Sequence, residues 1–264
     1  MERYRLTYRL SEVAPYINWP YFYHAWQVKD QGEQLRLRQQ AEKRIATAED
    51  KYATHALFAL ADANGDGDDI VFDSFRIPLL RQQKTVDDGT PNLCLSDFLR
   101  PLEQGIADKL GIFATTVDIG LETDFVSDDF ERLMHQLIAD RLAEATAERM
   151  HQEVRTRYWG YAPDEHLTMQ QLHSEQFQGI RPAVGYPSLP DASINFVLDG
   201  ILHFGDIGIR LTESGAMKPH ASVSGLMMAH PQARYFSIGT VGDDQLADYA
   251  QRRGVPLKLI RKFI

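Results

Sequence analysis

The most chemically specific segment of the chain surrounds a single arginine. Residues 179–187 read Gly-Ile-Arg-Pro-Ala-Val-Gly-Tyr-Pro, and Arg181 is their one charged side chain. A guanidinium offers a planar fork of donors that fits a carboxylate, and the prolines lower the entropic cost of ordering the loop. Arg181 therefore predicts a site for an amino acid or another carboxylate. An ion pair with a nearby Asp or Glu that pins the loop is an equally good interpretation of this stretch alone.

Two glycines flank that arginine, at positions where a ligand can approach the backbone. Glycine has no Cβ, so we expect the amide and carbonyl groups near Gly179 and Gly185 to contact the polar edge of a ligand. A second unusual segment begins with Leu-Thr-Glu-Ser-Gly-Ala-Met at 211–217 and continues through Ala-Ser-Val-Ser-Gly at 221–225 to a His-Pro pair at 230–231. Packing alone does not explain either composition.

A calcium-binding pattern in the first third of the chain is better interpreted as a solvated hairpin loop over 62–69. Acidic and amide side chains fall at the spacing of an EF-hand loop. However, the last position of that loop prefers a bidentate Glu, Asp69 stands where an EF-hand has an apolar residue, and Pro78 interrupts the helix that should follow. The residues that match the pattern are Asp62, Asn64, Asp66, Gly67 and Asp73.

Composition and charge narrow the classes of function. The chain has 264 residues, 44% of them hydrophobic, and a formal net charge of −9. That is enough to bury one large core, and the acidic balance argues against a nucleic-acid surface, which needs clustered Lys and Arg. No stretch approaches the roughly 20 apolar residues of a membrane span. The single Cys94 and the lack of a signal-peptide pattern predict a cytoplasmic protein.

Patterns in the first part of the chain predict helices around a few short strands. An aromatic cluster at 16–26 precedes a charged stretch, up to Lys51, that suits a surface helix. Strand-like runs follow at 55–60, 70–75 and 112–117. These runs are the candidate strands of a central sheet.

A long helix is predicted next, from Ser127 as its cap to about Arg157. Two aspartates follow Ser127 in the first turn, where the helix dipole favours anions. One apolar stripe at helical spacing is expected to face the core. The stripe consists of Phe130, Leu133, Met134, Leu137 and Ile138.

The remaining residues predict ordered loops, short strands and a final helix. Thr168 and Gln171 can open a short helix as a capping box. Strand-like runs follow at 207–211 and 235–241, and a helix over 243–253 should end at the glycine that comes next. Because helices and strands do not alternate strictly, we expect an α+β fold around an antiparallel sheet rather than a doubly wound parallel sheet.

Three motifs, in this order along the chain, carry a resemblance to a known family. They are Tyr-Trp-Gly-Tyr-Ala-Pro at 158–163, Arg-x-x-x-Gly-Tyr at 181–186, and the Leu-Thr-Glu-Ser to Ser-Gly to His-Pro stretch of 211–231. Together they resemble the C-terminal S-adenosylmethionine (AdoMet) binding domain of cobalamin-dependent methionine synthase, its activation domain. Weaker similarity upstream includes Tyr-Ile-Asn-Trp at 16–19, Gly67 to Ile70, Cys94 to Phe98 and Asp140 to Glu144.

This resemblance covers nearly the whole chain and implies one activation-like domain over residues 1–264. The implied fold is C-shaped, with a twisted antiparallel sheet and surrounding helices that include one long helix. AdoMet would lie in a shallow groove facing the corrin, with its carboxylate on Arg181 and its sulfonium near Tyr235. A ring face stabilises such a cation by up to about 2 kcal/mol. The implied AdoMet-binding residues are Asn18, Arg181, Ala183 through its backbone, Gly185, Tyr186, Tyr235 and Phe236.

Two of these positions carry alternatives. The family usually has Asp in the Tyr-Ile-Asp-Trp element, to receive the α-ammonium of the ligand, and this chain has Asn18. Asn18 still accepts a hydrogen bond but loses the ion pair, and charge-assisted bonds are roughly twice as strong as neutral ones. Tyr235 and Phe236 are otherwise a pair of strand residues, one of them buried and the other exposed.

The resemblance also implies a docking surface for a cobalamin-bearing module. Asp140 and Glu144 lie one helical turn apart and face the same way, although such a pair is more often a solvated face. His230 would approach the corrin edge, although a His before Pro is more often a turn residue. The implied docking residues are Asp140, Glu144, Glu175, Ser224, Gly225 and His230.

The implied function is reactivation of a cobalamin enzyme by reductive methylation, without a catalytic side chain or a metal site in this chain. The sequence holds neither an Asp-x-His-x-x-Gly corrin-binding motif nor a zinc-binding cysteine set. We therefore expect a split methionine synthase, with the cobalamin on another polypeptide and electrons from a flavodoxin-like or other reductase. The alternatives are an AdoMet-sensing or docking protein without methyl transfer, and a reactivator of a different corrinoid methyltransferase.

Overall fold

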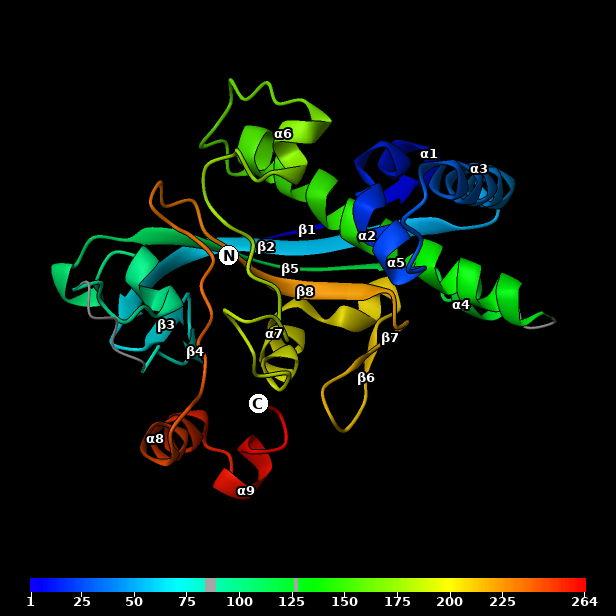
Figure 1. Ribbon diagram of the computed structural model, residues 1–264. Coiled ribbons are helices and arrows are strands. Elements are labelled where there is room, and N and C mark those ends of the chain that lie inside the picture. Colours follow the sequence, from blue (N-terminus) through cyan, green and yellow to red (C-terminus); the bar gives the residue numbers. More distant parts are fainter. Residues whose placement is uncertain (84–88, 126–127) are drawn as a thin grey trace.

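A six-stranded antiparallel sheet forms the centre of the computed structural model, which describes residues 1–83, 89–125 and 128–264. Its strand order is β4-β3-β2-β5-β8 (Figure 1). Strand β1 pairs with the first part of β2, and β3 pairs with the last part of the same strand. The strands are β1 (Glu2–Arg9), β2 (Ala53–Asp66), β3 (Asp69–Phe72), β4 (Phe75–Pro78), β5 (Asp108–Val117) and β8 (Ser222–Met227). A separate two-stranded sheet pairs β6 (Arg210–Leu211) with β7 (Met217–Lys218).

Helices cover both faces of the central sheet. They are α1 (Leu10–Val13), α2 (Trp19–Ala25), α3 (Gln31–Ala48), α4 (Gly120–Thr123), α5 (Asp129–Glu153), α6 (Met169–His173), α7 (Ile194–Leu202), α8 (Asp243–Arg253) and α9 (Leu257–Ile260). In Figure 1, α5 crosses one face together with α1 to α3, while α7 lies on the other. None of the helices in the described ranges is long and apolar enough to cross a membrane.

Side chains of β2 alternate between the two faces of the sheet and contribute to a buried cluster on each face. Successive side chains of a strand point to opposite faces of the sheet. Phe58 and Leu60 belong to the buried cluster that packs under α3 and α5, whereas Leu57 and Ala59 belong to the cluster under α7. Because both faces are covered, the run 56–61 is apolar without interruption. The α+β prediction with an antiparallel sheet is therefore confirmed.

The long helix is confirmed, with a different start and a narrower buried stripe than predicted. Asp128 is the N-cap and accepts hydrogen bonds from the amides of Phe130 and Glu131, while Ser127 lies outside the described residues. After Glu153 the helix continues as a π-helical turn to Tyr158. Phe130 is 42% exposed, because the first turn packs against Trp26 of the α2 segment and not over the sheet.

Within the predicted stripe, burial increases along the helix. Met134 and Ile138 are buried, Leu137 is partly buried, and Leu133 remains 44% exposed. The prediction of one buried stripe is therefore wrong for its first turn and right for the part that crosses the sheet. The capping box at Thr168 and Gln171 is confirmed.

Two predicted strands are wrong. Residues 235–241 are extended but belong to no sheet, because they lie along the loop at 187–188, where Ile238 donates to the carbonyl of Pro187 and Phe236 to the hydroxyl of Ser188. Of the run 207–211, only the last two residues are a strand, because a 3-10 turn ends at Gly208 with φ of 81°. The final helix, by contrast, is α8, which ends at Gly254 as predicted.

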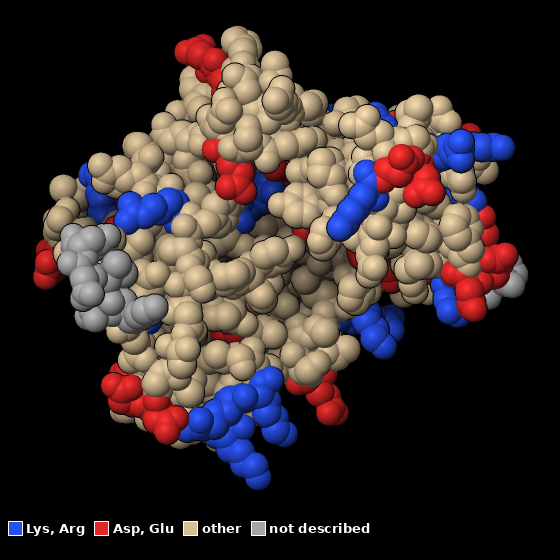
Figure 2. All heavy atoms as spheres, in the orientation of Figure 1, with Lys and Arg blue, Asp and Glu red and all other residues tan. Residues whose placement is uncertain are grey.

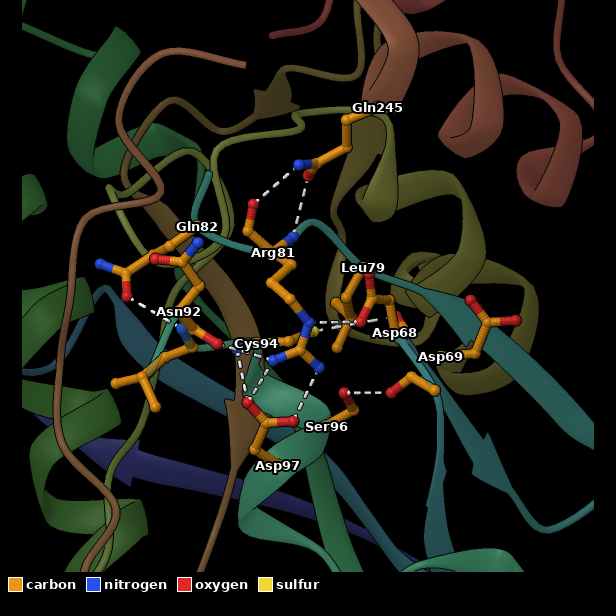
Figure 3. A network of polar contacts seen from close by, with 12 residues as sticks. Asp68, Asp69, Leu79, Arg81, Gln82, Asn92, Cys94, Ser96, Asp97 and Gln245 are labelled. Carbon is orange, nitrogen blue, oxygen red and sulfur yellow. Dashed lines mark hydrogen bonds and ion pairs between the residues drawn. The ribbon is translucent and has the colours of Figure 1, made fainter. Parts of the chain in front are cut away.

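The hairpin loop predicted over 62–69 is shorter than expected, since most of its residues belong to β2 and the turn is at Gly67 and Asp68. Three of its carboxylates, those of Asp66, Asp68 and Asp69, are paired with arginines. Figure 3 shows Arg81 between Asp68, at 2.6 Å, and Asp97, at 2.7 Å to each carboxylate oxygen. Asp69 is paired with Arg76 and Arg252. The pair of Asp69 with Arg252 connects the hairpin to α8. Among the residues at the EF-hand-like spacing, Asp66 forms an ion pair, with Arg76.

Candidate functional site

A cavity of about 660 Å³ lies between α5 and the loop that follows α6. It draws side chains from segments that are far apart in the sequence. On the face shown in Figure 2, charged side chains lie mostly toward the periphery and uncharged residues cover most of the middle. The cavity is lined by Tyr16, Asn18, Tyr21, Arg141, Glu144, Ala145, Glu148, Leu172, His173, Glu175, Arg181, Pro182, Ala183, Tyr186, Pro187, Ser188, Val223, Tyr235 and Phe236.

Arg181 lines this cavity and is also anchored to α5. Its Nη1 donates to the carbonyl of Ala147 at 3.2 Å, and its Nη2 donates to Oε2 of Glu148 at 3.3 Å. Only 13% of the side chain of either partner is exposed. The loop-pinning ion pair, which the sequence left open as an alternative, is therefore present. A guanidinium has five N–H donors, so Arg181 retains donors for a ligand carboxylate beside this pair.

Glu148 leaves one carboxylate oxygen without a partner. Its Oε1 is fully buried and makes no hydrogen bond within the described part of the chain. A buried oxygen of this kind costs free energy, and a charged donor that reached it would recover that cost. The α-ammonium of an amino acid lies one carbon away from its carboxylate. A ligand carboxylate on Arg181 would bring its ammonium close to Glu148.

Strand β8 holds the loop that carries Arg181. The amide of Leu226 donates to the carbonyl of Pro182 at 3.0 Å, and the amide of Val184 donates to the carbonyl of Ser224 at 2.9 Å. A Cβ at Gly225 would lie 2.2 Å from the carbonyl oxygen of Pro182, so this position needs glycine. The rigidity expected from the prolines is thus reinforced by a backbone ladder to the central sheet.

The two glycines near Arg181 allow backbone conformations with positive φ. At Gly179, φ is 86°, and a Cβ would lie 2.1 Å from the carbonyl oxygen of Met228. At Gly185, φ is 87°, and the amide donates to the carbonyl of Leu189 at 2.8 Å. The expectation that the Gly185 amide is free for a ligand is wrong, because a turn within the loop uses it. Gly185 does not itself line the cavity.

Two tyrosines connect the loop to its surroundings. The hydroxyl of Tyr235 accepts a hydrogen bond from the amide of Arg181 at 3.0 Å, and the residue, which is 40% exposed, lines the cavity. The hydroxyl of Tyr186 donates to Oε1 of Glu144 at 3.1 Å. The Glu144 carboxylate and burial raise the pKa of Tyr186 to about 12, so this hydroxyl remains a donor at neutral pH. Phe236, the next residue, also lines the cavity and packs against the core under α7.

Asn18 reaches the same cavity from the N-terminus of α2. It is the N-cap residue of that helix, but its side chain makes no capping hydrogen bond. Capping of α2 therefore does not occupy its side-chain amide, and the residue lines the cavity. The structure thus brings together Asn18, Arg181, Ala183, Tyr186, Tyr235 and Phe236, which the sequence analysis had grouped through the resemblance.

The family model of the vitamin B12 dependent methionine synthase activation domain matches residues 9–254. The chain belongs to this family. A solved structure of the MetH reactivation domain bound to AdoHcy superposes with a TM-score of 0.95 and 32% sequence identity, covering 100% of this chain and 89% of that chain. The two share a curled antiparallel sheet with one long helix. The resemblance inferred from the three motifs is therefore confirmed.

The docking residues expected of this activation domain differ in their surroundings. Glu144 and Glu175 line the cavity, whereas Asp140 contacts His220, with 3.5 Å between Oδ1 and the ring Nδ1. Burial raises the pKa of Asp140. Ser224 is only 1% exposed because it lies behind the Arg181 loop.

Gly225 and His230 contact other parts of the chain. Gly225 is buried against Pro182. His230 accepts a hydrogen bond from the amide of Gln232 at 3.2 Å and lies 6.2 Å from the ring of Phe98. These contacts fit the turn residue that the sequence left open as an alternative, and the approach of His230 to the corrin edge stays a prediction. Surface contacts by Ser224 and Gly225 with a cobalamin module would require the loop at 182–184 to move.

The sequence analysis missed several residues of the activation-domain cavity. Glu148 is the most important of these, and its signal was present, because it follows Glu144 by four residues and so occupies the same helix face. His173 lies at the end of α6, where its Nε2 is 3.0 Å from the carbonyl oxygen of Tyr16. That contact joins two residues that are 157 positions apart in the sequence, and no local pattern indicates it.

Proposed function

We propose that this activation domain binds AdoMet in the 660 Å³ cavity and presents the methyl group to a cobalamin held by other modules. One observation carries the proposal. An arginine with unused donors, a buried carboxylate oxygen without a partner among the described residues, and an exposed tyrosine ring line a single cavity. These three groups complement the carboxylate, the ammonium and the sulfonium of AdoMet. The solved relative was bound to AdoHcy.

Each end of the ligand has a proposed partner. Arg181 binds the α-carboxylate, and Asn18 and Glu148 accept hydrogen bonds from the α-ammonium. Glu148 supplies the negative charge that Asn18 lacks, and charge-assisted hydrogen bonds are worth about 1.5–3 kcal/mol. The ring of Tyr235 stabilises the sulfonium, and the amide of Arg181 fixes the ring position by donating to the tyrosine hydroxyl.

The rest of the loop completes the proposed site. Ala183 and Gly185 shape the backbone beside the ligand, Tyr186 covers it, and Phe236 supports Tyr235 from the core side. In this proposal no side chain acts as acid, base or nucleophile, and the protein contributes position and orientation. Bound cobalamin would supply the metal centre that accepts the methyl group when the inactive cofactor is reduced and remethylated. Glu144 and Glu175, at the cavity, are the proposed contacts to the cobalamin module.

We further propose that this cobalamin belongs to a separate polypeptide and that a flavodoxin-like or other reductase supplies the electron. The proposal is supported by the family, which is the activation domain of a B12-dependent methionine synthase. A second candidate is an AdoMet sensor that does not transfer the methyl group. The observation that favours it is Asn18, which weakens the ammonium site. A third candidate function is reactivation of a different corrinoid methyltransferase.

Titration calorimetry with AdoMet tests the first part of the proposal, which is that the chain binds this ligand. We expect the wild-type chain to bind, the Arg181→Ala variant to lose binding, and Arg210→Ala, which replaces an exposed arginine on β6, to bind like the wild type. Absence of binding by the folded wild-type chain would contradict the proposal. Mixing the chain with separately produced cobalamin modules, a reductant and AdoMet labelled in the methyl group then separates the hypotheses. Transfer of the label supports reactivation, and binding without transfer supports the sensor.

A further inference from the structure

One wall of the cavity belongs to a segment that lies outside the hydrophobic cores. Residues 160–179, here called the arm, leave the end of α5, include α6 and return to the loop that carries Arg181 (Figure 1). Leu172 and His173 of the arm line the cavity. No residue of the arm, which the structure describes in full, belongs to the three buried hydrophobic clusters. Burial in a shared apolar core therefore does not fix the position of this wall.

A fully buried arginine lies where the arm joins α5. Arg155 has no exposed surface, and an arginine is almost never fully buried unless it is paired. Its Nε and Nη2 donate to the two carboxylate oxygens of Glu165, each at 2.7 Å, and only 6% of the Glu165 side chain is exposed. The guanidinium carbon lies 4.0 Å from the centre of the Phe177 ring. Arg155 therefore contacts the arm on both sides of α6, before it and after it.

A third contact fixes the guanidinium of Arg155 to α5. Its Nη1 lies 2.8 Å from Nδ1 of His151. Because a guanidinium can only donate, Nδ1 is the acceptor, and the proton of this neutral ring is on Nε2. All three nitrogen atoms of the guanidinium thus have partners, which determines the orientation of its plane. Arg155 belongs to the π-helical turn Val154–Tyr158, where α5 ends and the chain turns into the arm.

Further hydrogen bonds hold the two ends of the arm and its tip. The hydroxyl of Tyr161 donates to the carbonyl of Gln178 at 3.3 Å, which joins the start of the arm to its end. At the tip, Nε2 of His173 donates to the carbonyl of Tyr16 at 3.0 Å. The arm is therefore positioned by directional polar contacts, and the fully buried ones are those of Arg155.

We propose that Arg155 is a positioning residue for AdoMet binding. With Glu165 and Phe177 it holds the arm so that Leu172 and His173 complete the wall of the cavity, although none of these three anchoring residues lines the cavity itself. The role rests on the proposed function, because AdoMet is the ligand that the wall contacts. A buried ion pair adds little stability over apolar side chains of the same volume, but its bidentate hydrogen bonds specify one geometry. An arm held in that geometry lowers the cost of ordering the site when the ligand binds.

Replacing the ion pair by apolar side chains separates position from stability. The double variant Arg155→Met with Glu165→Leu leaves no unpaired charge, so the chain should stay folded in urea unfolding. Its affinity for AdoMet in calorimetry should fall by about tenfold. Hydrogen exchange of the arm amides should become about tenfold faster in the ligand-free double variant, because the arm opens more often. Phe177→Leu, which keeps both charges and removes the ring beside the guanidinium, should change affinity and exchange in the same direction by a smaller factor.

A matched control removes an ion pair at the other end of the same helix. Arg44→Met with Glu131→Leu separates α3 from the first turn of α5, and neither residue lines the cavity. This control should change neither AdoMet affinity nor exchange in the arm. A change as large as that of the first double variant would overturn the positioning role, because any loss of an ion pair on α5 would then weaken binding.

The remaining outcomes separate the positioning role from the proposed function. A folded double variant at 155 and 165 that binds AdoMet at wild-type affinity would overturn the role, and so would weaker binding with wild-type exchange in the arm. If that variant does not fold, wild-type affinity in Phe177→Leu overturns the role in the same way. Absence of AdoMet binding by the folded wild-type chain overturns the proposed function, whereas faster exchange in the ligand-free double variant still supports the hold of Arg155 on the arm.

Discussion

The ion pair between Arg181 and Glu148 allows ligand recognition to be separated from folding. The two side chains are each 13% exposed, and their closest N–O distance is 3.3 Å. Replacing one partner of a buried pair leaves the other charge unpaired, which costs about 3–5 kcal/mol. Since both groups retain some contact with the cavity, we expect Arg181→Ala to lower the free energy of unfolding by about 3 kcal/mol, at the lower end of that range.

A second substitution should restore stability without restoring binding. In Arg181→Ala with Glu148→Gln, no unpaired charge remains, so about 2 kcal/mol of the lost free energy of unfolding should return. The ligand carboxylate would still lack its charged partner. Two charge-assisted hydrogen bonds at about 1.5 kcal/mol each correspond to a loss of affinity of about a hundredfold or more.

Urea unfolding and calorimetry, performed on the same preparations, measure the two effects. The single variant should be destabilised and unable to bind, and the double variant should be nearly as stable as the wild type and equally unable to bind. A double variant as unstable as the single one would refute the claim that an unpaired Glu148 causes the destabilisation. AdoMet binding by the stable double variant at wild-type affinity would refute the role of Arg181 as the carboxylate partner.

Three further predictions follow from single residues. Asn18→Asp should tighten AdoMet binding by about fivefold, because the bond to the ligand ammonium gains about 1 kcal/mol, and unchanged or weaker affinity in calorimetry would place the ammonium elsewhere. Gly225→Ala should lower the free energy of unfolding by about 1–3 kcal/mol and weaken AdoMet binding, because its Cβ would lie 2.2 Å from the carbonyl oxygen of Pro182. The control is Gly200→Ala in α7, where a Cβ meets nothing within 4 Å. It should raise the free energy of unfolding by about 0.5–1 kcal/mol in the same urea assay. Burial, followed by the charge of Arg155, holds the pKa of His151 well below its usual value, so between pH 7.5 and 5.5 the unfolded chain takes up a proton that the folded chain does not. Stability should therefore fall by about 1.4 kcal/mol over that interval through this residue, and His151→Gln should lose that part of the pH dependence in urea unfolding while the exposed His24→Gln keeps it.

Local signals predicted several elements correctly because their physical causes lie within a few residues. Glycine at 254 adopts the left-handed conformation that ends α8, and Thr168 and Gln171 form the reciprocal hydrogen bonds of a capping box. The rigid loop around Arg181 was evident from its prolines and glycines. At 62–73 the sequence favoured a hairpin loop over a calcium site, but it could not show that Asp69 pairs with Arg252, 183 residues along the chain.

The extended segment at 235–241 shows where local patterns fail. Its residue types favour a strand, but a strand needs a partner edge, and this segment instead lies along the loop at 187–188. The first turn of α5 fails for a related reason. Phe130 has the correct helical spacing, yet its neighbour is Trp26 and not the sheet.

The sequence by itself determined the family, the α+β class, the long helix and the loop that presents Arg181, because each depends on the order and type of residues. Tertiary structure alone decided how the site is assembled. Tyr235 contacts the Arg181 amide across 54 residues, and Glu148 contacts the Arg181 guanidinium across 33. Asn18 reaches the same cavity from the start of the chain. Such contacts depend on how the sheet and α5 bring distant segments together, and the free energy that fixes them comes from burial of the shared core rather than from any local pattern.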